Sequence, residues 1–426
     1  MSERESPPKA AEPASRWGAL RHRDFRLLWA ARTVSSAGDR ITLLALPSTA
    51  ILVLGASAGQ VGALNAVAFL AWPVLGLFVG VWVDRLRRRP ILIAADLGRA
   101  LLIGSIPAAY ALGDLGLPQL FVVAGLVGAL TVFFDLAVTA HTPVIVPAAD
   151  WADANAKVEI ASQAVYALGP GVAGALIAFL TAPFALVADA GSFLISGALI
   201  GLTTREEAPP SKAGRRSLLR EAGEGLRFIV GRPVLLRIAV TAAISNVGLL
   251  MGLAVQLLFL YRVMHLSPLL VGISFGVGCL GSLVGAAFTG RLMARLGIHL
   301  TLTVSSGLEG LALLLIPLGL FGPILPLLML GLAASGFWGT VWNVSVTTFR
   351  QRIISREVMG RVTAGMRVIA FGALPIGSLL GGAVGQGLAN RFGTGRGLAL
   401  TLVLAALLAA SSALSLLSSK GFEETA

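Results

Sequence analysis

The decapeptide Gly80-Val-Trp-Val-Asp84-Arg85-Leu-Arg87-Arg88-Arg89 lies between two apolar runs, at residues 61–79 and 90–112. An aspartate followed by four arginines must be solvated, so this turn is expected at a membrane surface. A partly preserved copy of this turn follows 210 residues later, again between apolar runs: Gly290-Arg291-Leu-Met-Ala-Arg295-Leu296-Gly297. A charged turn that recurs half a chain later indicates two related membrane halves, as in many transporters.

The composition of the chain also indicates a membrane protein. Of its 426 residues, 56% are hydrophobic and only 13% are charged. Apolar runs of about 20 residues, the length that crosses a bilayer, recur along it. The sequence therefore predicts an all-α membrane protein with twelve transmembrane helices, at residues 25–54, 60–82, 90–113, 118–146, 157–181, 183–203, 234–263, 268–290, 299–320, 323–349, 358–386 and 396–418.

These spans group into two six-helix bundles related by a pseudo-two-fold axis. We expect an N-terminal bundle at 25–203 and a C-terminal bundle at 234–418, with tails at 1–24 and 419–426. The linker, 204–233, is polar, and its leucines and isoleucine recur at helical spacing. That spacing predicts an amphipathic helix on the membrane surface between the bundles.

The basic residues predict the orientation of the chain. Most of them fall in the tails and in alternate loops, which the positive-inside rule places in the cytoplasm together with both termini. The net charge of +12 would then face anionic lipid heads. Nucleic-acid binding is disfavoured, because the basic residues are dispersed over many loops. Arginine far outnumbers lysine, which is typical of a GC-rich bacterial genome, so a bacterial cytoplasmic membrane is expected.

A second signature lies in the fifth span, Gly169-Pro170-Gly171-Val-Ala173-Gly174. Proline kinks a helix, and glycine lets a neighbouring helix approach closely. Pro375 in the eleventh span follows Pro170 by 205 residues, close to the 210-residue offset of the charged turns. Two landmarks with nearly one offset favour a duplication.

With these two signatures the chain resembles the major facilitator superfamily. The first turn is similar to the superfamily motif Gly-x-x-x-Asp-Arg-x-Gly-Arg-Arg, with Arg87 where glycine is usual. The fifth-span signature resembles the antiporter motif of drug exporters, with Ala173 replacing a glycine. Finer features, such as Phe25-Arg26-Leu27-Leu28-Trp29, resemble the branch that includes the enterobactin exporter and macrolide efflux proteins.

The resemblance implies alternating access, in which the two bundles rock around a central cavity. Asp84 is expected to face the start of the eleventh helix, near Met359–Arg361, and to hold the cytoplasmic gate shut. The alternative is that the turn only enforces topology. The gating candidates are Gly80, Asp84, Arg85, Arg88, Arg89, Gly169, Pro170, Gly174, Arg361 and Arg367.

Asp39 in the first span and Asp135 in the fourth are the proton-coupling candidates. The resemblance implies that both helices line the cavity, and a carboxylate in a poorly hydrated site takes up a proton readily. For Asp39 the alternative is an ion pair or helix cap with Arg40 or Arg32. For Asp135 it is a static hydrogen bond to a neighbouring helix.

Other intramembrane charges are interpreted as structural. Asp96 and Arg99, three residues apart, are expected to pair with each other or with the turn of Arg85, and Asp189 to bond to a neighbouring helix. Glu309 is interpreted in the same way. The substrate-cavity candidates form a mixed aromatic and polar set that suits a bulky amphipathic molecule: Arg40, Phe133, Phe134, Asn246, Gln256, Trp338, Trp342 and Asn343.

The sequence therefore predicts a secondary transporter that exports a drug, antibiotic or siderophore, most simply as a monomeric proton antiporter. Uptake, or a lipid translocator or sensor with a transporter fold, remains an alternative. An enzyme is disfavoured, because the four histidines are scattered and no metal or phosphate-binding motif occurs. No cofactor or metal is expected; the expected partners are substrate, protons and lipids.

Overall fold

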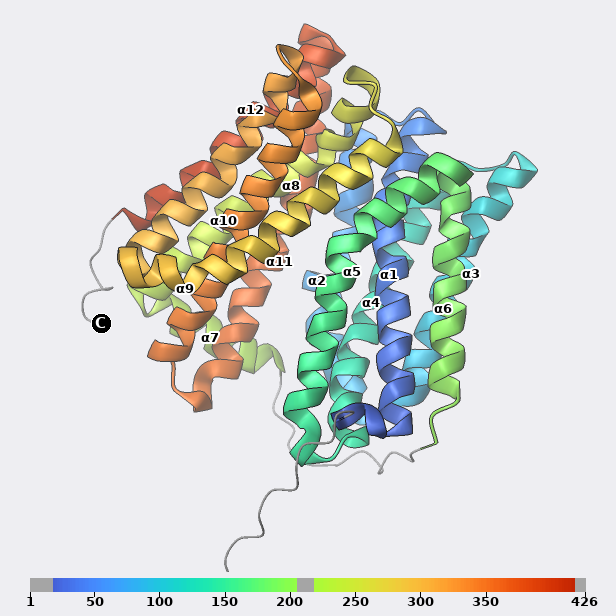
Figure 1. Cartoon of the computed structure of the whole chain (residues 1–426), viewed down its shortest axis with the longest axis vertical. Coiled ribbons are helices and arrows are strands. Elements are labelled where there is room, and N and C mark those ends of the chain that lie inside the picture. The colour runs from blue at the N-terminus through green and yellow to red at the C-terminus, as the bar shows by residue number, and fades with distance from the viewer. Residues whose placement is uncertain (1–17, 205–217, 418–426) are drawn as a thin grey trace, which may run out of the picture.

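The computed structural model describes residues 18–204 and 218–417, which form helices joined by short connections (Figure 1). The predicted tail at 419–426 therefore lies wholly outside the described residues, the tail at 1–24 lies mostly outside them, and the predicted linker lies outside them at 205–217. The first half contains α1 (Arg23–Leu52), α2 (Ala58–Arg85), α3 (Arg88–Leu112), α4 (Leu117–Ile145), α5 (Trp151–Leu180) and α6 (Ala182–Gly201). The second contains α8 (Pro233–Leu258), α9 (Pro268–Ala312), α10 (Ile324–Ile353), α11 (Arg356–Phe392) and α12 (Thr394–Ser411).

Shorter helices complete the described fold. In the segment predicted as the linker lies α7 (Leu218–Val230). A π-helical turn, η3 (Phe259–Val263), continues α8, and short 3₁₀ turns occur as η1 (Gly18–Arg21), η2 (Ala148–Asp150), η4 (Leu313–Leu315), η5 (Pro317–Leu320) and η6 (Ser412–Leu416).

The described helices fit the twelve expected spans. Ten of them are long and apolar enough to cross a membrane. One of the ten, α9, is two helices in sequence, because Gly297 has φ 74° and ψ 166° and breaks the helical path there. This glycine ends the second copy of the charged turn, where the sequence predicted a loop. α1 is 30 residues long but carries several charges, and it is not among these ten helices; we count it as a further span.

The two halves repeat one framework at an offset of 210 residues. α1 and α8 begin at Arg23 and Pro233. α2 and α9 begin at Ala58 and Pro268. Even the caps correspond: the hydroxyls of Ser57 and Ser267 each accept a hydrogen bond of 3.4 Å from the backbone N–H three residues later. The duplication predicted from the charged turns therefore extends to helix ends that carry no charge.

The two bundles meet near the end of the molecule at which α1 ends, which we call the closed face. In Figure 1 they meet at the top and diverge downward, toward the N-terminal face, where α1 begins. At the closed face the hydroxyls of Ser48 and Tyr261 are 3.0 Å apart, and Arg262 donates to the carbonyl of Ile51 at 3.1 Å.

Two glycine crossings join the bundles on the same side. A Cβ on Gly62 would collide with the backbone of Gly382, so α2 and α11 are in backbone contact there. A Cβ on Gly272 would collide with Gly174, which joins α9 to α5. Gly62 and Gly272 are 210 residues apart, and Gly174 and Gly382 are 208 apart. The closed face is thus built from two copies of one crossing.

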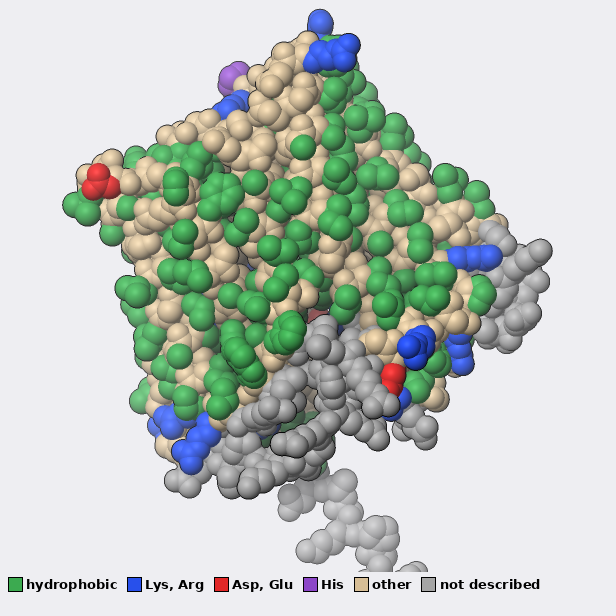
Figure 2. All heavy atoms as spheres, turned by 180° about the vertical axis from the view of Figure 1, so that it is seen from behind, with side chains coloured by type: hydrophobic (Ala, Val, Ile, Leu, Met, Phe, Trp, Pro, Cys, Tyr) green, Lys and Arg blue, Asp and Glu red, His purple; other side chains and the backbone are tan. Residues whose placement is uncertain are grey.

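The outer flank of the molecule is suited to lipid. Figure 2 shows hydrophobic side chains spread over the flank in view, with Lys and Arg toward its edges. Large apolar side chains such as Leu101, Phe179 and Phe321 are more than three-quarters exposed, at 76%, 81% and 88%. Such exposure is expected where hydrocarbon replaces water.

Candidate functional site

Arg99 of α3 is fully buried inside the first bundle, and its guanidinium group joins α3 to α1. It donates to Asp96 Oδ1 at 2.5 Å and to Ser35 Oγ of α1 at 3.2 Å. Its Nη1 lies 3.6 Å from Asp39 Oδ1, also on α1. The predicted pairing of Asp96 with Arg99 is confirmed. The ion-pair alternative for Asp39 is also found, but the partner is Arg99.

Two aromatic rings enclose this guanidinium group. Its Cζ lies 4.4 Å from the ring centre of Phe134 on α4 and 4.2 Å from that of Phe193 on α6. Aromatic faces carry negative electrostatic potential, so the rings stabilise a cation from which water has been removed. Phe134, predicted from the sequence to contact substrate, lies against Arg99, and its role in substrate contact stays a prediction.

Asp189 of α6 extends the polar network to a second position on α1. Its carboxylate accepts hydrogen bonds from Thr42 and, at 3.1 Å, from Ser192. A Cβ on Gly38 would lie on top of both Asp189 and Ser192, so only glycine leaves room for them. The predicted bond from Asp189 to a neighbouring helix is confirmed.

Four carboxyl groups, from Asp39, Asp96, Asp135 and Asp189, all interact electrostatically with Arg99, and we call them the carboxylate cluster. Asp39 also interacts with Arg40, and Asp135 with both Asp39 and Arg32. Among the described residues, four acids thus face three guanidinium groups, of which only that of Arg99 is fully buried. Both proton-coupling candidates belong to one network.

A polar pocket leads from the N-terminal face toward this cluster. It has an empty volume of about 490 Å³ between α1, α4 and α5, and Arg32, Thr139 and Asn155 contribute to its lining. Thr139 donates to the backbone carbonyl of Asp135, one turn further into the helix, at 2.8 Å. Water in this pocket would come within one helical turn of the cluster.

A second, mostly apolar cavity lies between the two bundles. Its empty volume is about 560 Å³, and its lining residues come from α1, α2, α5, α8 and α9: Arg40, Leu43, Leu44, Pro47, Asn65, Phe69, Pro170, Leu253, Leu257 and Phe275. Arg40 is the cation of this lining, with its Cζ 4.9 Å from the ring centre of Tyr166. Because Asp39 precedes Arg40 on α1, the cluster and the cavity are adjacent.

Apart from Arg40, the predicted substrate-contact residues are not among the residues that line this cavity. Asn246 donates to the carbonyl of Ala370 on α11 at 3.2 Å, and Asn343 to Gly339 of its own helix at 2.8 Å. Gln256 is buried, and Trp342 is 7% exposed.

The two other aromatic candidates have aromatic neighbours. The ring centre of Phe133 lies 6.1 Å from that of Trp82, and that of Trp338 lies 4.9 Å from that of Phe337. Their roles in substrate contact remain predictions.

The gating candidates lie at the ends and crossings of helices. Arg89 donates to the carbonyls of Ile200 and Gly201, so it caps α6 from the start of α3. Arg361 pairs with Glu224 of α7 at 3.2 Å. Arg367 is exposed on α11 and interacts electrostatically with Arg350.

In the fifth-span signature, Gly169 packs on the Arg40 side chain and Gly174 forms the crossing with Gly272. Pro170 lines the cavity. The side chains of Asp84 and Arg85 lie outside the described residues, so the gating roles of Gly80, Asp84, Arg85 and Arg88 stay predictions.

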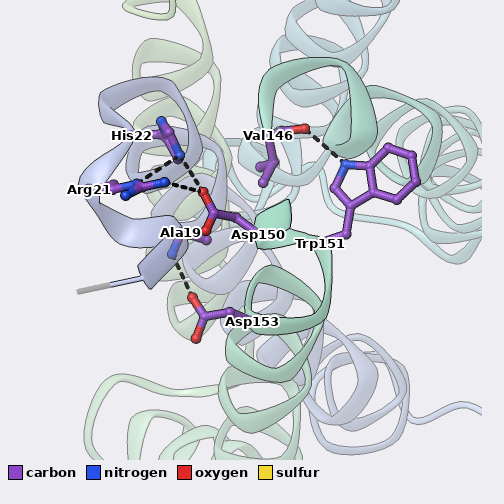
Figure 3. A network of polar contacts seen from close by, with 7 residues as sticks. All are labelled: Ala19, Arg21, His22, Val146, Asp150, Trp151 and Asp153. Atoms are coloured by element: carbon purple, nitrogen blue, oxygen red, sulfur yellow. Dashed lines mark hydrogen bonds and ion pairs between the residues drawn. The ribbon is translucent and has the colours of Figure 1, made fainter. Parts of the chain in front are cut away.

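One network at the N-terminal face was missed from the sequence (Figure 3). Asp150 pairs with Arg21 at 3.0 Å and with His22 at 2.8 Å. The backbone N–H of Ala19 donates to Asp153 at 2.6 Å. Together these contacts fasten η1 to the start of α5. Their residues are about 130 positions apart, so no local pattern could have revealed them.

Comparison with known proteins agrees with this architecture. The family model described as "Major Facilitator Superfamily" matches residues 28–373. The chain belongs to the Major Facilitator Superfamily. This confirms the resemblance and the fold class predicted from the sequence.

Relatives of this superfamily member include multidrug exporters. It is 31% identical over 373 residues to the "Multidrug efflux pump Tap" of Mycolicibacterium fortuitum, covering 84% of this chain and 87% of the relative. It is 26% identical to the Tap pump of Mycobacterium tuberculosis strain H37Rv, covering 84% and 85%. These relatives are transporters, as expected from the sequence.

Solved structures share its fold. A mutant of the nucleoside transporter NupG superposes with a TM-score of 0.78 at 14% identity, covering 92% of this chain and 98% of that one. A bacterial homologue of the human lysosomal transporter Spinster gives 0.72 at 16% identity, covering 95% and 98%. At such identities the likeness concerns the fold alone.

Proposed function

We propose that this superfamily member exports bulky amphipathic organic compounds by alternating access, as a monomeric proton antiporter. The observation that carries the proposal is the adjacency of the carboxylate cluster and the inter-bundle cavity at Asp39 and Arg40. A proton bound at one site can thereby influence substrate at the other. Kinship with pumps named for multidrug efflux supports export over uptake.

The shape and lining of the cavity favour an amphipathic substrate. Most of its lining is aliphatic or aromatic, with Arg40 and Asn65 as polar groups. Apolar walls with few polar groups suit drug-sized molecules, because burial supplies affinity and the polar groups fix orientation.

The charge balance of the cluster suggests how a proton couples to transport. If all four carboxyl groups were ionised, they would exceed the three guanidinium groups by one negative charge, and an uncompensated charge within a membrane is costly. Binding of one proton would balance the cluster. Asp39, whose side chain is 37% exposed and next to the cavity, and Asp135, close to the polar pocket, are the carboxyl groups that could exchange it.

The orientation predicted from the basic residues makes this conformation inward-open. With both termini in the cytoplasm of a bacterial cell, the closed face is external and the bundles diverge toward the cytoplasm (Figure 1). A substrate would then enter from the cytoplasm, and a gate that includes Asp84 would close behind it.

The experiment is uptake of ethidium into everted membrane vesicles, where export from the cell appears as accumulation. We expect accumulation that depends on an inward-acidic pH gradient and collapses with a protonophore. Asp39→Asn and Asp135→Asn should each reduce gradient-driven accumulation strongly, while exchange of ethidium without a gradient is retained.

Glu159→Gln is the matched control, because Glu159 is an exposed acid at the N-terminal face whose side chain accepts from Gln163. Accumulation only in right-side-out vesicles would favour uptake. Movement of fluorescent phospholipid without ethidium transport would favour a lipid translocator.

A further inference from the structure

The 210-residue repeat brings two ionisable residues, the buried Arg99 and the half-buried Glu309, into correspondence. Arg99 of α3 and Glu309 of α9 are 210 positions apart, and so are Ser35 of α1 and Ser245 of α8. Arg99 donates to the hydroxyl of Ser35 at 3.2 Å, and the hydroxyl of Ser245 donates to Glu309 Oε2 at 3.5 Å. The helix pair and the serine are kept, whereas the charge has changed sign.

The surroundings of Glu309 make room for a carboxyl group, but no cation among the described residues pairs with it. A Cβ on Gly339 of α10 would lie 2.5 Å from Glu309 Oε1, so glycine is needed at that position. The next residue, Gly310, is in backbone contact with Ala410 of α12. Glu309 is thus enclosed by helices of the second bundle.

The charged groups on neighbouring elements lie far along their helices. They are Arg237 on α8, Arg350 and Arg352 on α10, Arg396 on α12, and Arg291, Arg295 and His299 on α9 itself. At 1.5 Å per residue, Arg237 is about 12 Å from Ser245 along α8, and Arg350 is about 16 Å from Gly339 along α10. Of the described residues, only Ser245 has a polar interaction with the Glu309 carboxyl group.

An ionised carboxylate in this position would have one weak hydrogen bond and no cation, within the width of a membrane. That arrangement strongly favours the neutral acid. A change of packing between α8, α9 and α10 that admits water would favour ionisation instead. The same side chain would therefore hold a proton in one conformation and release it in another.

We propose that Glu309 is a second proton-binding residue, located in the C-terminal bundle, that takes up and releases a proton during the transport cycle. One proton from water binds the carboxylate oxygen and later returns to water, with no other bond made or broken. This inference rests on the proposed proton-coupled transport, but the occupancy of Glu309 by a proton can be tested without any transport.

The direct test is infrared difference spectroscopy of the full-length protein in lipid bilayers, after a change of pH. The wild type should show the carbonyl stretch of a protonated carboxyl group that is absent from Glu309→Gln and present in the Glu159→Gln control. Glu309→Asp, which keeps an acid, should retain the signal with a shifted pH midpoint. A signal unchanged in both Glu309 variants would overturn the proposal, whether or not the protein moves ethidium.

The functional test measures coupling with ethidium as the probe. One proton that moves down a gradient of one pH unit releases the free energy that maintains a tenfold concentration ratio of substrate. If Glu309→Gln loses one of the coupled protons, ethidium accumulation under that gradient should therefore fall about tenfold. Exchange without a gradient should be retained, which a merely structural defect would not allow. Wild-type accumulation in Glu309→Gln, or an equal loss of exchange, would refute a role in coupling.

Discussion

In the first bundle Arg99 is surrounded by partners: two carboxylates and a serine hydroxyl approach its guanidinium group, and two aromatic rings enclose it. In the second bundle Glu309 occupies the corresponding place, 210 residues later, with a single long hydrogen bond from Ser245. The first arrangement is suited to keep a charge in the membrane, and the second to avoid one.

The difference teaches which features of the duplicated unit have been retained. The serine caps of α2 and α9 and the crossings at Gly62 and Gly272 are the same in both halves. These residues determine how helices begin and meet, so each half needs them. The buried ionisable position can change, because the other packing contacts hold the helices together. The repeat thus preserves the framework and allows the two halves to handle charge differently.

Arg99→Gln should produce the largest effect. It removes the buried cation of the carboxylate cluster and leaves Asp96 and its neighbours uncompensated, at a cost of about 3–5 kcal/mol in unfolding free energy. Thermal unfolding of the purified protein in detergent should show a markedly lower midpoint. Glu309→Gln, which replaces a neutral acid by an amide of similar shape, should leave the midpoint nearly unchanged. Equal losses in the two variants would break the comparison.

The glycine crossings provide a test in which both halves should respond alike. Gly272→Val and Gly62→Val would each overpack the closed face, which typically costs about 1–3 kcal/mol. We expect both to shift the protein toward conformations open at that face, as measured by thiol labelling of cysteines introduced there after Cys279 is replaced. Gly171→Ala is the control, because nothing lies within 4 Å of a Cβ at that position. A shift in only one variant would show that the two crossings are not equivalent.

Much of this fold could be predicted from the sequence, for a physical reason. A membrane-spanning helix must satisfy its own backbone hydrogen bonds, so its length and hydrophobicity can be recognised in one continuous stretch of sequence. The two charged turns at Gly80 and Gly290 supplied the offset that also relates the serine caps. The pair Asp96–Arg99 was equally accessible, because residues three apart on a helix are neighbours.

The site could be predicted only in part, because its contacts join helices that are distant in the chain. Arg99 meets Ser35 from 64 residues away, and Asp189 meets Thr42 from 147 away. The periodicity of hydrophobic residues along a helix does not indicate such contacts between distant segments. For the same reason the contact of Phe134 with Arg99 was not predicted, since a sequence does not show which neighbour each face of a buried helix meets. The 210-residue offset alone could have shown that Glu309 corresponds to Arg99. What this correspondence means, however, depends on the packing around Glu309.

The smallest effects should come from the two serines, and their order sharpens the comparison. Interhelical hydrogen bonds in membranes contribute about 0.6 kcal/mol on average, and somewhat more when one partner is charged. Ser35→Ala removes a 3.2 Å bond from charged Arg99, whereas Ser245→Ala removes a 3.5 Å bond to an acid that we expect to be neutral. Unfolding midpoints in one detergent should therefore fall more for Ser35→Ala. If Ser245→Ala proved the more damaging, Glu309 would have to be ionised, and the contrast between a charge-keeping and a charge-avoiding bundle would be wrong.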